Sequence, residues 1–92
     1  MIIVSQNGDI VNYENIVEIY KTFGHKKNIQ IEAETVNNDF ITLGEYATEK
    51  RAKEVLEEII KAYIESKEAQ EITTIFGFSI IPSNTYYEMP KE

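Results

Sequence analysis

The sequence predicts an α+β fold. We expect a small antiparallel β-sheet, one amphipathic helix over about 49–68 packed on one face of it, and a β-hairpin-like segment after the helix. Apolar and polar residues alternate in short runs up to residue 46, and apolar residues recur every three or four positions from about residue 49. An uncharged, β-branched run follows the helical stretch. The 92 residues support one hydrophobic core, so a single domain over 1–92 is expected.

Turn residues divide the first half of the chain into short predicted strands. Asn7-Gly8 accepts the positive φ angles of a tight hairpin and separates apolar runs over 2–5 and 10–13. A longer, half-buried strand is predicted over 16–23. The alternation in this strand predicts that its buried face carries Val17, Ile19 and Phe23.

Two further strands precede the helix. The run over 29–34 has the clearest alternation in the sequence, with Ile29, Ile31 and Ala33 on one face. The strand over 40–46 contains Gly44, which marks a bulge or a close approach of another element. Adjacent strands joined by short turns favour antiparallel pairing.

The helix has a start signal and a continuous apolar stripe. Thr48 is a suitable N-cap, and Glu49 lies in the first turn, where the helix dipole favours an acidic side chain. We expect the stripe to pack on the face of the 29–34 strand, because these are the two apolar stripes of matching length. The stripe consists of Ala52, Val55, Leu56, Ile59, Ile60 and Tyr63.

The ten residues over 72–81 carry no charge and are rich in β-branched and aromatic types, which predicts a strand, with 85–89 pairing back on it. A hydrophobic strand at an open edge is an aggregation hazard unless another element covers it. We therefore expect a homodimer in which the 72–87 segment forms much of a two-fold interface, by strand pairing or by face packing. The alternative is a central strand of a monomer, covered by the N-terminal hairpin. The predicted interface residues are Ile75, Phe76, Phe78, Ile80, Tyr86 and Tyr87.

The charge balance argues against nucleic-acid and membrane partners. Sixteen acidic and nine basic residues give a net charge of −7, which repels polyanions and anionic lipid surfaces. The first residues lack the charged and apolar regions of a signal peptide, and the longest uncharged stretch is too short and polar to span a bilayer. A cytoplasmic location is therefore expected.

Residues able to hold a metal or carry out catalysis are few. The chain has no cysteine, and His25, in a predicted turn, is its only histidine, so thiolate and multi-histidine sites are excluded within one subunit. Glu32 and Glu34 share a strand face, but alternation explains them as solvated side chains. A basic group at the start of the helix, namely Lys50, Arg51 and Lys53, is neutralised by nearby glutamates. No glycine lies in a phosphate-loop context, so we expect no catalytic residue, metal or cofactor.

Three segments carry a resemblance to a known group of proteins. They are IIVSQ at 2–6, LGEYATEKRAKEVL at 43–56 and YEMP at 87–90. Together they are similar to small uncharacterised proteins of Gram-positive bacteria and their phages, and the likeness covers nearly the whole chain. The resemblance implies a prokaryotic cytoplasm or a mobile element, and it implies no activity, cofactor or catalytic residue.

Two classes of function therefore remain open. The first is a non-catalytic protein–protein interaction or structural module, related to phages, that acts as a homo-oligomer by self-association or strand addition. The second is a small enzyme or small-ligand-binding protein with a site at the sheet–helix seam or between subunits. A ring of acidic residues lining a pocket favours the second class, whereas a continuous apolar face favours the first.

Overall fold

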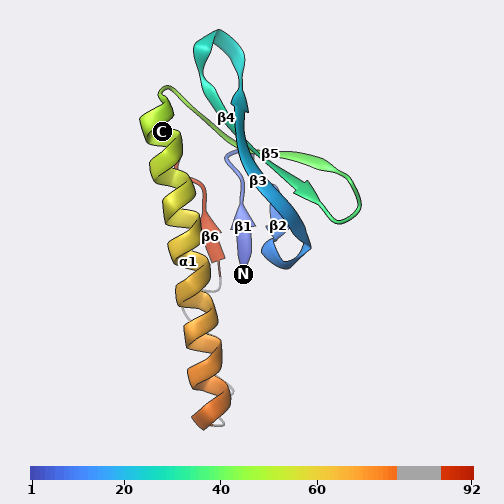
Figure 1. Cartoon of the computed structure of the whole chain (residues 1–92), viewed down its shortest axis with the longest axis vertical. Helices are drawn as coiled ribbons and strands as arrows, with labels where there is room; N and C mark the ends of the chain where they lie inside the picture. The colour runs from blue at the N-terminus through green and yellow to red at the C-terminus, as the bar shows by residue number, and fades with distance from the viewer. Residues whose placement is uncertain (77–85) are drawn as a thin grey trace.

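A computed structural model describes residues 1–76 and 86–92 and confirms the α+β fold (Figure 1). The first sheet, which we call the N-terminal sheet, has the order β2-β1-β6; the central sheet has the order β3-β4-β5. The elements in chain order are β1 (Ile2–Val4), β2 (Ile10–Asn12), the 3-10 turn η1 (Tyr13–Asn15), β3 (Ile16–Phe23), the 3-10 turn η2 (His25–Lys27), β4 (Ile29–Thr35), β5 (Phe40–Tyr46), α1 (Glu49–Phe76) and β6 (Tyr86–Glu88).

The strand pairing follows the predicted turns. The hairpin between β1 and β2 turns at Gly8, whose φ of 89° requires glycine-like freedom, and Gly8 N–H donates to the Ser5 carbonyl at 3.0 Å. Within the central sheet, β4 pairs antiparallel with both β3 and β5. The two sheets meet where Gln6 N–H donates to the Leu43 carbonyl at 2.8 Å.

The predicted buried face of β3 is wrong at two of its three residues. Val17 is exposed because a register shift between Ile16 and Glu18 places it in a bulge opposite β4. Phe23 is 86% exposed, at the far end of the β3–β4 hairpin. Of these three residues, only Ile19 packs against the core.

Gly44 has both features that the sequence predicts. Ile31 pairs with Gly44 but the next residue pairs with Thr42, so Leu43 is an extra residue in β5. A Cβ atom on Gly44 would lie 2.9 Å from the hydroxyl oxygen of Tyr46 and 3.0 Å from Cδ of Gln6. This close approach lets Gln6 reach the backbone of β5.

The helix begins where predicted and packs on the central sheet. Thr48 Oγ1 accepts a hydrogen bond from Arg51 N–H at 3.1 Å, as an N-cap does. The buried core joins Ile31 and Ala33 of β4 to Ile59 of α1, and Leu56 and Tyr63 pack against this core. No helix in the described part of the chain is long and apolar enough to cross a membrane.

The strand predicted over 72–81 is wrong for its first half, because α1 continues to Phe76. No glycine or proline interrupts the chain between Glu49 and Phe76, and extending an existing helix costs far less than starting one. Helix propagation therefore overrides the weak strand preference of Ile and Thr. The other half of that strand, with Phe78 and Ile80, lies outside the described residues.

A strand does follow the helix, as predicted, but it pairs with β1, whereas the sequence predicted the 72–81 segment as its partner. Tyr86–Glu88 pairs with Ile2–Val4 in parallel, and Met89 N–H donates to the Val4 carbonyl at 2.9 Å. The pairing brings Met89 into the core, where it is almost fully buried. The two ends of the described chain are thus held in one sheet.

Gln6 connects the three segments that carry the sequence resemblance. Its Nε2 donates to the Pro90 carbonyl at 2.8 Å and to the Glu45 carbonyl at 3.3 Å, while its Oε1 accepts from Glu45 N–H at 2.8 Å. Tyr46 O–H also donates to the Pro90 carbonyl, at 2.8 Å. The segments 2–6, 43–56 and 87–90 therefore meet at one junction between the two sheets.

Candidate functional site

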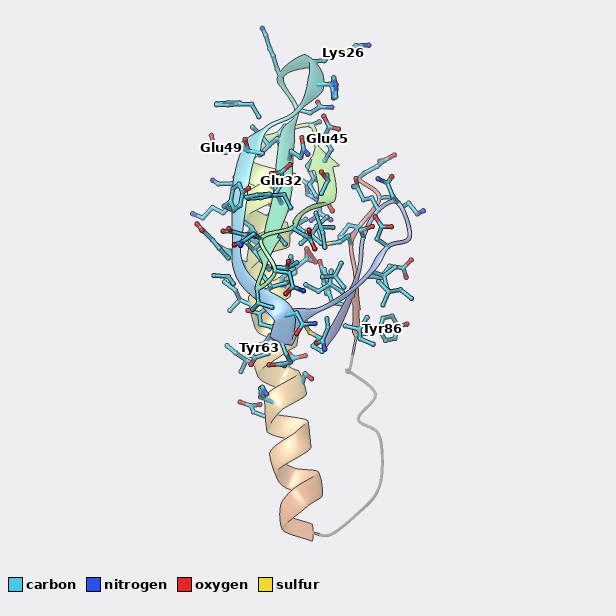
Figure 2. The ribbon with its side chains drawn as sticks, turned by 90° about the vertical axis from the view of Figure 1, so that its right-hand side faces the viewer. Lys26, Glu32, Glu45, Glu49, Tyr63 and Tyr86 are labelled. Atoms are coloured by element: carbon cyan, nitrogen blue, oxygen red, sulfur yellow. The ribbon has the colours of Figure 1, made fainter. Side chains whose placement is uncertain are left out.

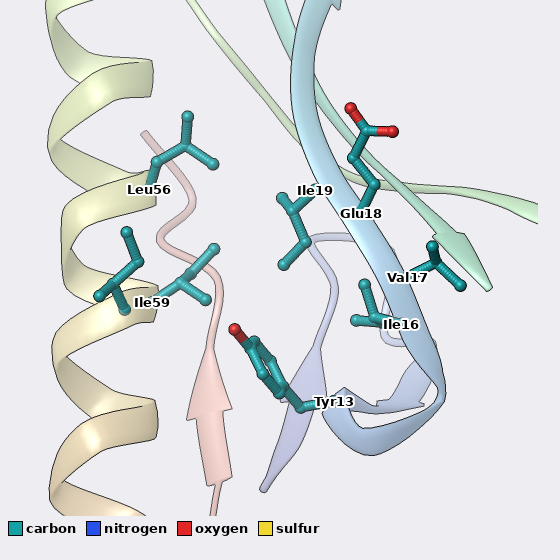
Figure 3. A pocket seen from close by; sticks show the side chains of 8 residues that line it. Tyr13, Ile16, Val17, Glu18, Ile19, Leu56 and Ile59 are labelled. Carbon is teal, nitrogen blue, oxygen red and sulfur yellow. The ribbon is translucent and has the colours of Figure 1, made fainter. Parts of the chain in front are cut away.

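A groove runs between α1 and β3, at the sheet–helix seam (Figure 3). Its cavity has a volume of about 280 Å³. The helix contributes one wall and the start of β3, with the turn before it, contributes the other. The lining residues are Tyr13, Ile16, Val17, Glu18, Ile19, Leu56, Ile59 and Ile60.

The turn η1 places an aromatic side chain at one end of the groove. Asn12 Oδ1 accepts from Glu14 N–H at 3.0 Å and so caps the turn that carries Tyr13. The ring of Tyr13 stacks on that of Tyr63, with centroids 4.1 Å apart and planes inclined by 25°. Lys67 Nζ lies 5.5 Å from the Tyr63 ring centroid and 3.7 Å from Glu14 Oε1, which joins α1 to this turn.

The lining of the groove suits apolar contact better than catalysis. Glu18 is the only charged side chain among its described lining residues. Burial, followed by the neighbouring Tyr63, raises the pKa of Tyr13 above its ordinary value, so this hydroxyl is a weaker acid than a free tyrosine. Among the described lining residues there is no second carboxylate and no histidine that could form an acid–base pair with Glu18.

Apolar side chains continue from the groove along α1, at the border between its core-facing side and its solvent side. We call Leu56, Ile60, Tyr63 and Ile64 the α1 apolar strip. Ile60 is 55% exposed and Ile64 is 50% exposed, whereas Leu56 and Tyr63 pack partly against the core. Beyond this strip, α1 extends past both sheets (Figure 2). The strip therefore lies where the helix leaves the body of the protein.

The structure separates the predicted interface residues. Ile75 and Phe76 lie in the last turn of α1, and Phe78 and Ile80 are outside the described residues. Tyr86 is exposed on the open face of the N-terminal sheet, where it pairs with Ile2 (Figure 2). Tyr87 lies on the opposite face of that sheet and is half-buried.

Tyr87 carries a buried polar group. Among the described residues its hydroxyl has no hydrogen-bond partner. Burial, and secondarily the Glu58 carboxylate, raise the pKa of Tyr87 strongly. In the unfolded chain this hydroxyl loses its proton near pH 10, while the folded chain retains it, so stability falls as pH rises above that value.

We expect Tyr87→Phe to keep or raise the free energy of unfolding at pH 7, by up to about 1 kcal/mol, because it removes an unsatisfied hydroxyl. It should also reduce the loss of stability between about pH 9 and pH 11. Urea unfolding across this pH range measures both effects. A variant with the alkaline slope of the wild type would contradict the assignment.

The other candidate residues occupy ordinary surface positions. His25 lies in η2, in a turn as expected. Glu32 lies on the outer face of the central sheet, where it accepts hydrogen bonds from Tyr20 O–H and Gln30 Nε2, each at 3.0 Å. Arg51 pairs with two glutamates of α1. Within the described residues, no group of three metal-ligating side chains comes together.

Sequence reasoning located the seam but not the residues of the groove. The sequence predicts no site at Tyr13 or Ile16. The bulge between Ile16 and Glu18, which changes the direction of the side chains at the start of β3, arises from pairing with β4 and has no local sequence signal. The sequence predicts Ile60 in the apolar stripe that packs on the sheet, but Ile60 is exposed, because spacing alone does not distinguish the edge of a stripe from its centre.

Comparison with protein-family models, with curated proteins and with solved structures finds no match for this chain.

Proposed function

We propose that this protein is a non-catalytic interaction module that associates with itself through α1. The observation that carries the proposal is the exposed α1 apolar strip, which borders an apolar groove. Ile60 and Ile64 gain little from their own chain, and a second copy would remove them from water. A two-fold arrangement would place each strip against the groove of the other copy.

The dimensions of α1 support this proposal. The helix has 28 residues, a length of about 42 Å. Its second half extends past the sheets and carries Ile75 and Phe76, two of the predicted interface residues. Because residues 72–76 lie in α1, we propose that two copies pack helical faces together rather than pair strands.

The setting of this function is also a proposal. Action in a prokaryotic cytoplasm, in a bacterium or its phage, rests on the sequence resemblance alone. The resemblance is carried by the segments that meet around Gln6, and they share only Leu56 with the α1 apolar strip.

Solution mass tests the proposal. We expect light scattering at increasing concentration to show wild-type protein moving from 10.6 kDa toward twice that mass. Ile64→Lys should weaken self-association by at least about tenfold, because the change occurs twice in a two-fold interface and burying the exposed half of each isoleucine contributes about 0.7–1.5 kcal/mol.

A neighbouring position provides the control. Glu65→Gln alters the net charge by the same amount as Ile64→Lys, at an exposed residue next to the strip. We expect Glu65→Gln to associate as the wild type does. Wild-type protein that stays at monomer mass up to high micromolar concentration, or equal behaviour of the two variants, would refute self-association through α1.

A second candidate function is binding of a small apolar ligand in the groove. The cavity volume, about 280 Å³, lies near the lower limit of ligand pockets. A monomeric wild-type protein that binds an apolar dye saturably at one site, with the binding abolished by Ile16→Lys, would favour this alternative over self-association.

A further inference from the structure

Two strand edges border one hollow: β2 in the N-terminal sheet, and β5 over residues 40–42, before the part of its edge that Gln6 occupies. In the N-terminal sheet β2 is an edge strand, and in the central sheet β5 is an edge strand. Within the described residues, no backbone–backbone hydrogen bond joins β2 to β5. The hollow between them has a volume of about 510 Å³ and is lined by Asn7, Asp9, Ile10, Val11, Phe40, Ile41 and Thr42.

The ladder of β5 shows which of its backbone groups are unused. Thr35 N–H donates to the Asp39 carbonyl at 2.9 Å, and the register continues with Ala33 opposite Ile41. Hydrogen-bonded and non-hydrogen-bonded pairs alternate along an antiparallel ladder, so Ile41 bonds to β4. The N–H and C=O groups of Phe40 and Thr42 therefore point away from β4.

The same argument applies to β2. Ser5 N–H donates to the Asp9 carbonyl, and Tyr13 N–H donates to the Met1 carbonyl, each at 2.9 Å. These bonds fix the alternation, so Val11 bonds to β1 while the backbone groups of Ile10 point outward. Among the described residues, the outward backbone groups of Ile10 in β2 and of Phe40 and Thr42 in β5 thus have no backbone partner.

Apolar side chains stand beside these unpaired groups. Ile10 is 74% exposed and Phe40 is 63% exposed, one at each side of the hollow. Exposed hydrophobic edges of this kind are usually blunted by lysine, proline or a covering element. Neither lysine nor proline occurs in β2 or β5.

We propose that this hollow binds an extended peptide segment of another protein by strand addition. The bound strand would pair with Phe40 and Thr42 of β5 along one edge and would lie against Ile10 of β2 along the other. A helix could not use these groups, because its own backbone donors and acceptors are already paired. The surface is separate from the α1 apolar strip, so this inference does not depend on self-association.

Charge restricts the sequence of the partner. Asp9 is the charged side chain among the described residues that line the hollow, and no lysine or arginine lies with it. The outer face beside β5 carries Glu32 and Glu34, which pair with Thr42 and Phe40. A segment with alternating apolar residues and one basic residue is therefore complementary, whereas an acidic segment is repelled.

A blocked seven-residue peptide tests the proposal. The probe alternates threonine and valine and has one central lysine. Its matched control has the same sequence with alternate backbone amides N-methylated, which removes the donors and keeps the side chains and charge. We expect the first peptide to bind saturably in a calorimetric or NMR titration, and the methylated peptide to bind at least about tenfold more weakly.

Protein variants identify the edge that is used. Thr42→Pro removes a backbone N–H that points away from β4, and proline is tolerated at such positions of natural edge strands. The variant should bind the peptide at least about tenfold more weakly. Thr42→Val is its control: both changes lose the hydrogen bond that Thr42 Oγ1 accepts from Gln30 Nε2 at 2.7 Å, but valine keeps the N–H and should bind normally.

A side-chain pair covers the case in which Thr42→Pro fails to fold. Ile10→Lys should weaken binding at least about tenfold, whereas Ile2→Lys, on the same face of the N-terminal sheet but outside the hollow, should bind as the wild type does. Absence of saturable peptide binding, equal binding of the methylated peptide, or equal binding by Ile10→Lys and Ile2→Lys would overturn the proposal.

Discussion

Replacing Ile59 with alanine is expected to lower the free energy of unfolding by about 2–5 kcal/mol. Ile59 is 2% exposed and belongs to the core cluster that contains Ile31 and Ala33 of β4. Ile59 also lines the α1–β3 groove, so truncating its side chain would enlarge this cavity. The loss would be a large part of the roughly 5–15 kcal/mol available to a domain of this kind.

Urea unfolding measures this loss, at concentrations where the wild type is monomeric. Ile60→Ala is the matched control, because it removes the same atoms from the next residue of the same helix, where the side chain is 55% exposed. The control should cost less than about 1 kcal/mol. A loss below about 0.5 kcal/mol for Ile59→Ala would show that α1 is not docked on the central sheet as described.

Short sequence patterns predicted the core face of one strand, the start of the helix and the first hairpin. The alternation at Ile29, Ile31 and Ala33 predicted the core face of β4, and Thr48 predicted the start of α1. The Asn7-Gly8 turn predicted the first hairpin. In each case the side chains that decide the structure lie within a few residues of the element they define.

Features that depend on distant residues could not be predicted in this way. The end of α1 is set by competition between helix extension and strand formation, so the composition of 72–76 was misleading. The bulge that exposes Val17 arises from pairing with β4, and β6 pairs with a strand more than 80 residues away. The α1–β3 groove lies at the sheet–helix seam, but it is bordered by β3, whereas the sequence predicted the 29–34 strand as the partner of the helix. The β2–β5 hollow is formed between strands that the sequence does not show as neighbours.

Replacing Gln6 with alanine is expected to lower the free energy of unfolding by about 2–4 kcal/mol, although the change removes only one polar side chain. Its amide donates to the Glu45 carbonyl and accepts from Glu45 N–H, so its loss would leave these two partly buried backbone groups without that partner. The Pro90 carbonyl would lose the Gln6 donor and keep the hydrogen bond from Tyr46 O–H. An unsatisfied buried group costs about 1–3 kcal/mol, more than a hydrogen bond that water can replace.

Gln30→Ala provides the comparison that isolates this effect. Gln30 Nε2 donates to Glu32 and to Thr42, at 3.0 and 2.7 Å, but these partners are side chains, which can reorient toward water, whereas the backbone groups bound by Gln6 are fixed in β5. We expect Gln30→Ala to lower the free energy of unfolding by less than about 1 kcal/mol.

Hydrogen exchange gives a second, local measurement. Because Gln6 joins β5 to the segment after β6, the Glu45 and Met89 amides should exchange faster in Gln6→Ala than the loss of global stability explains. Gln30→Ala should show no such local acceleration. Equal unfolding energies for the two variants would mean that the junction at Gln6 is no more than a surface contact.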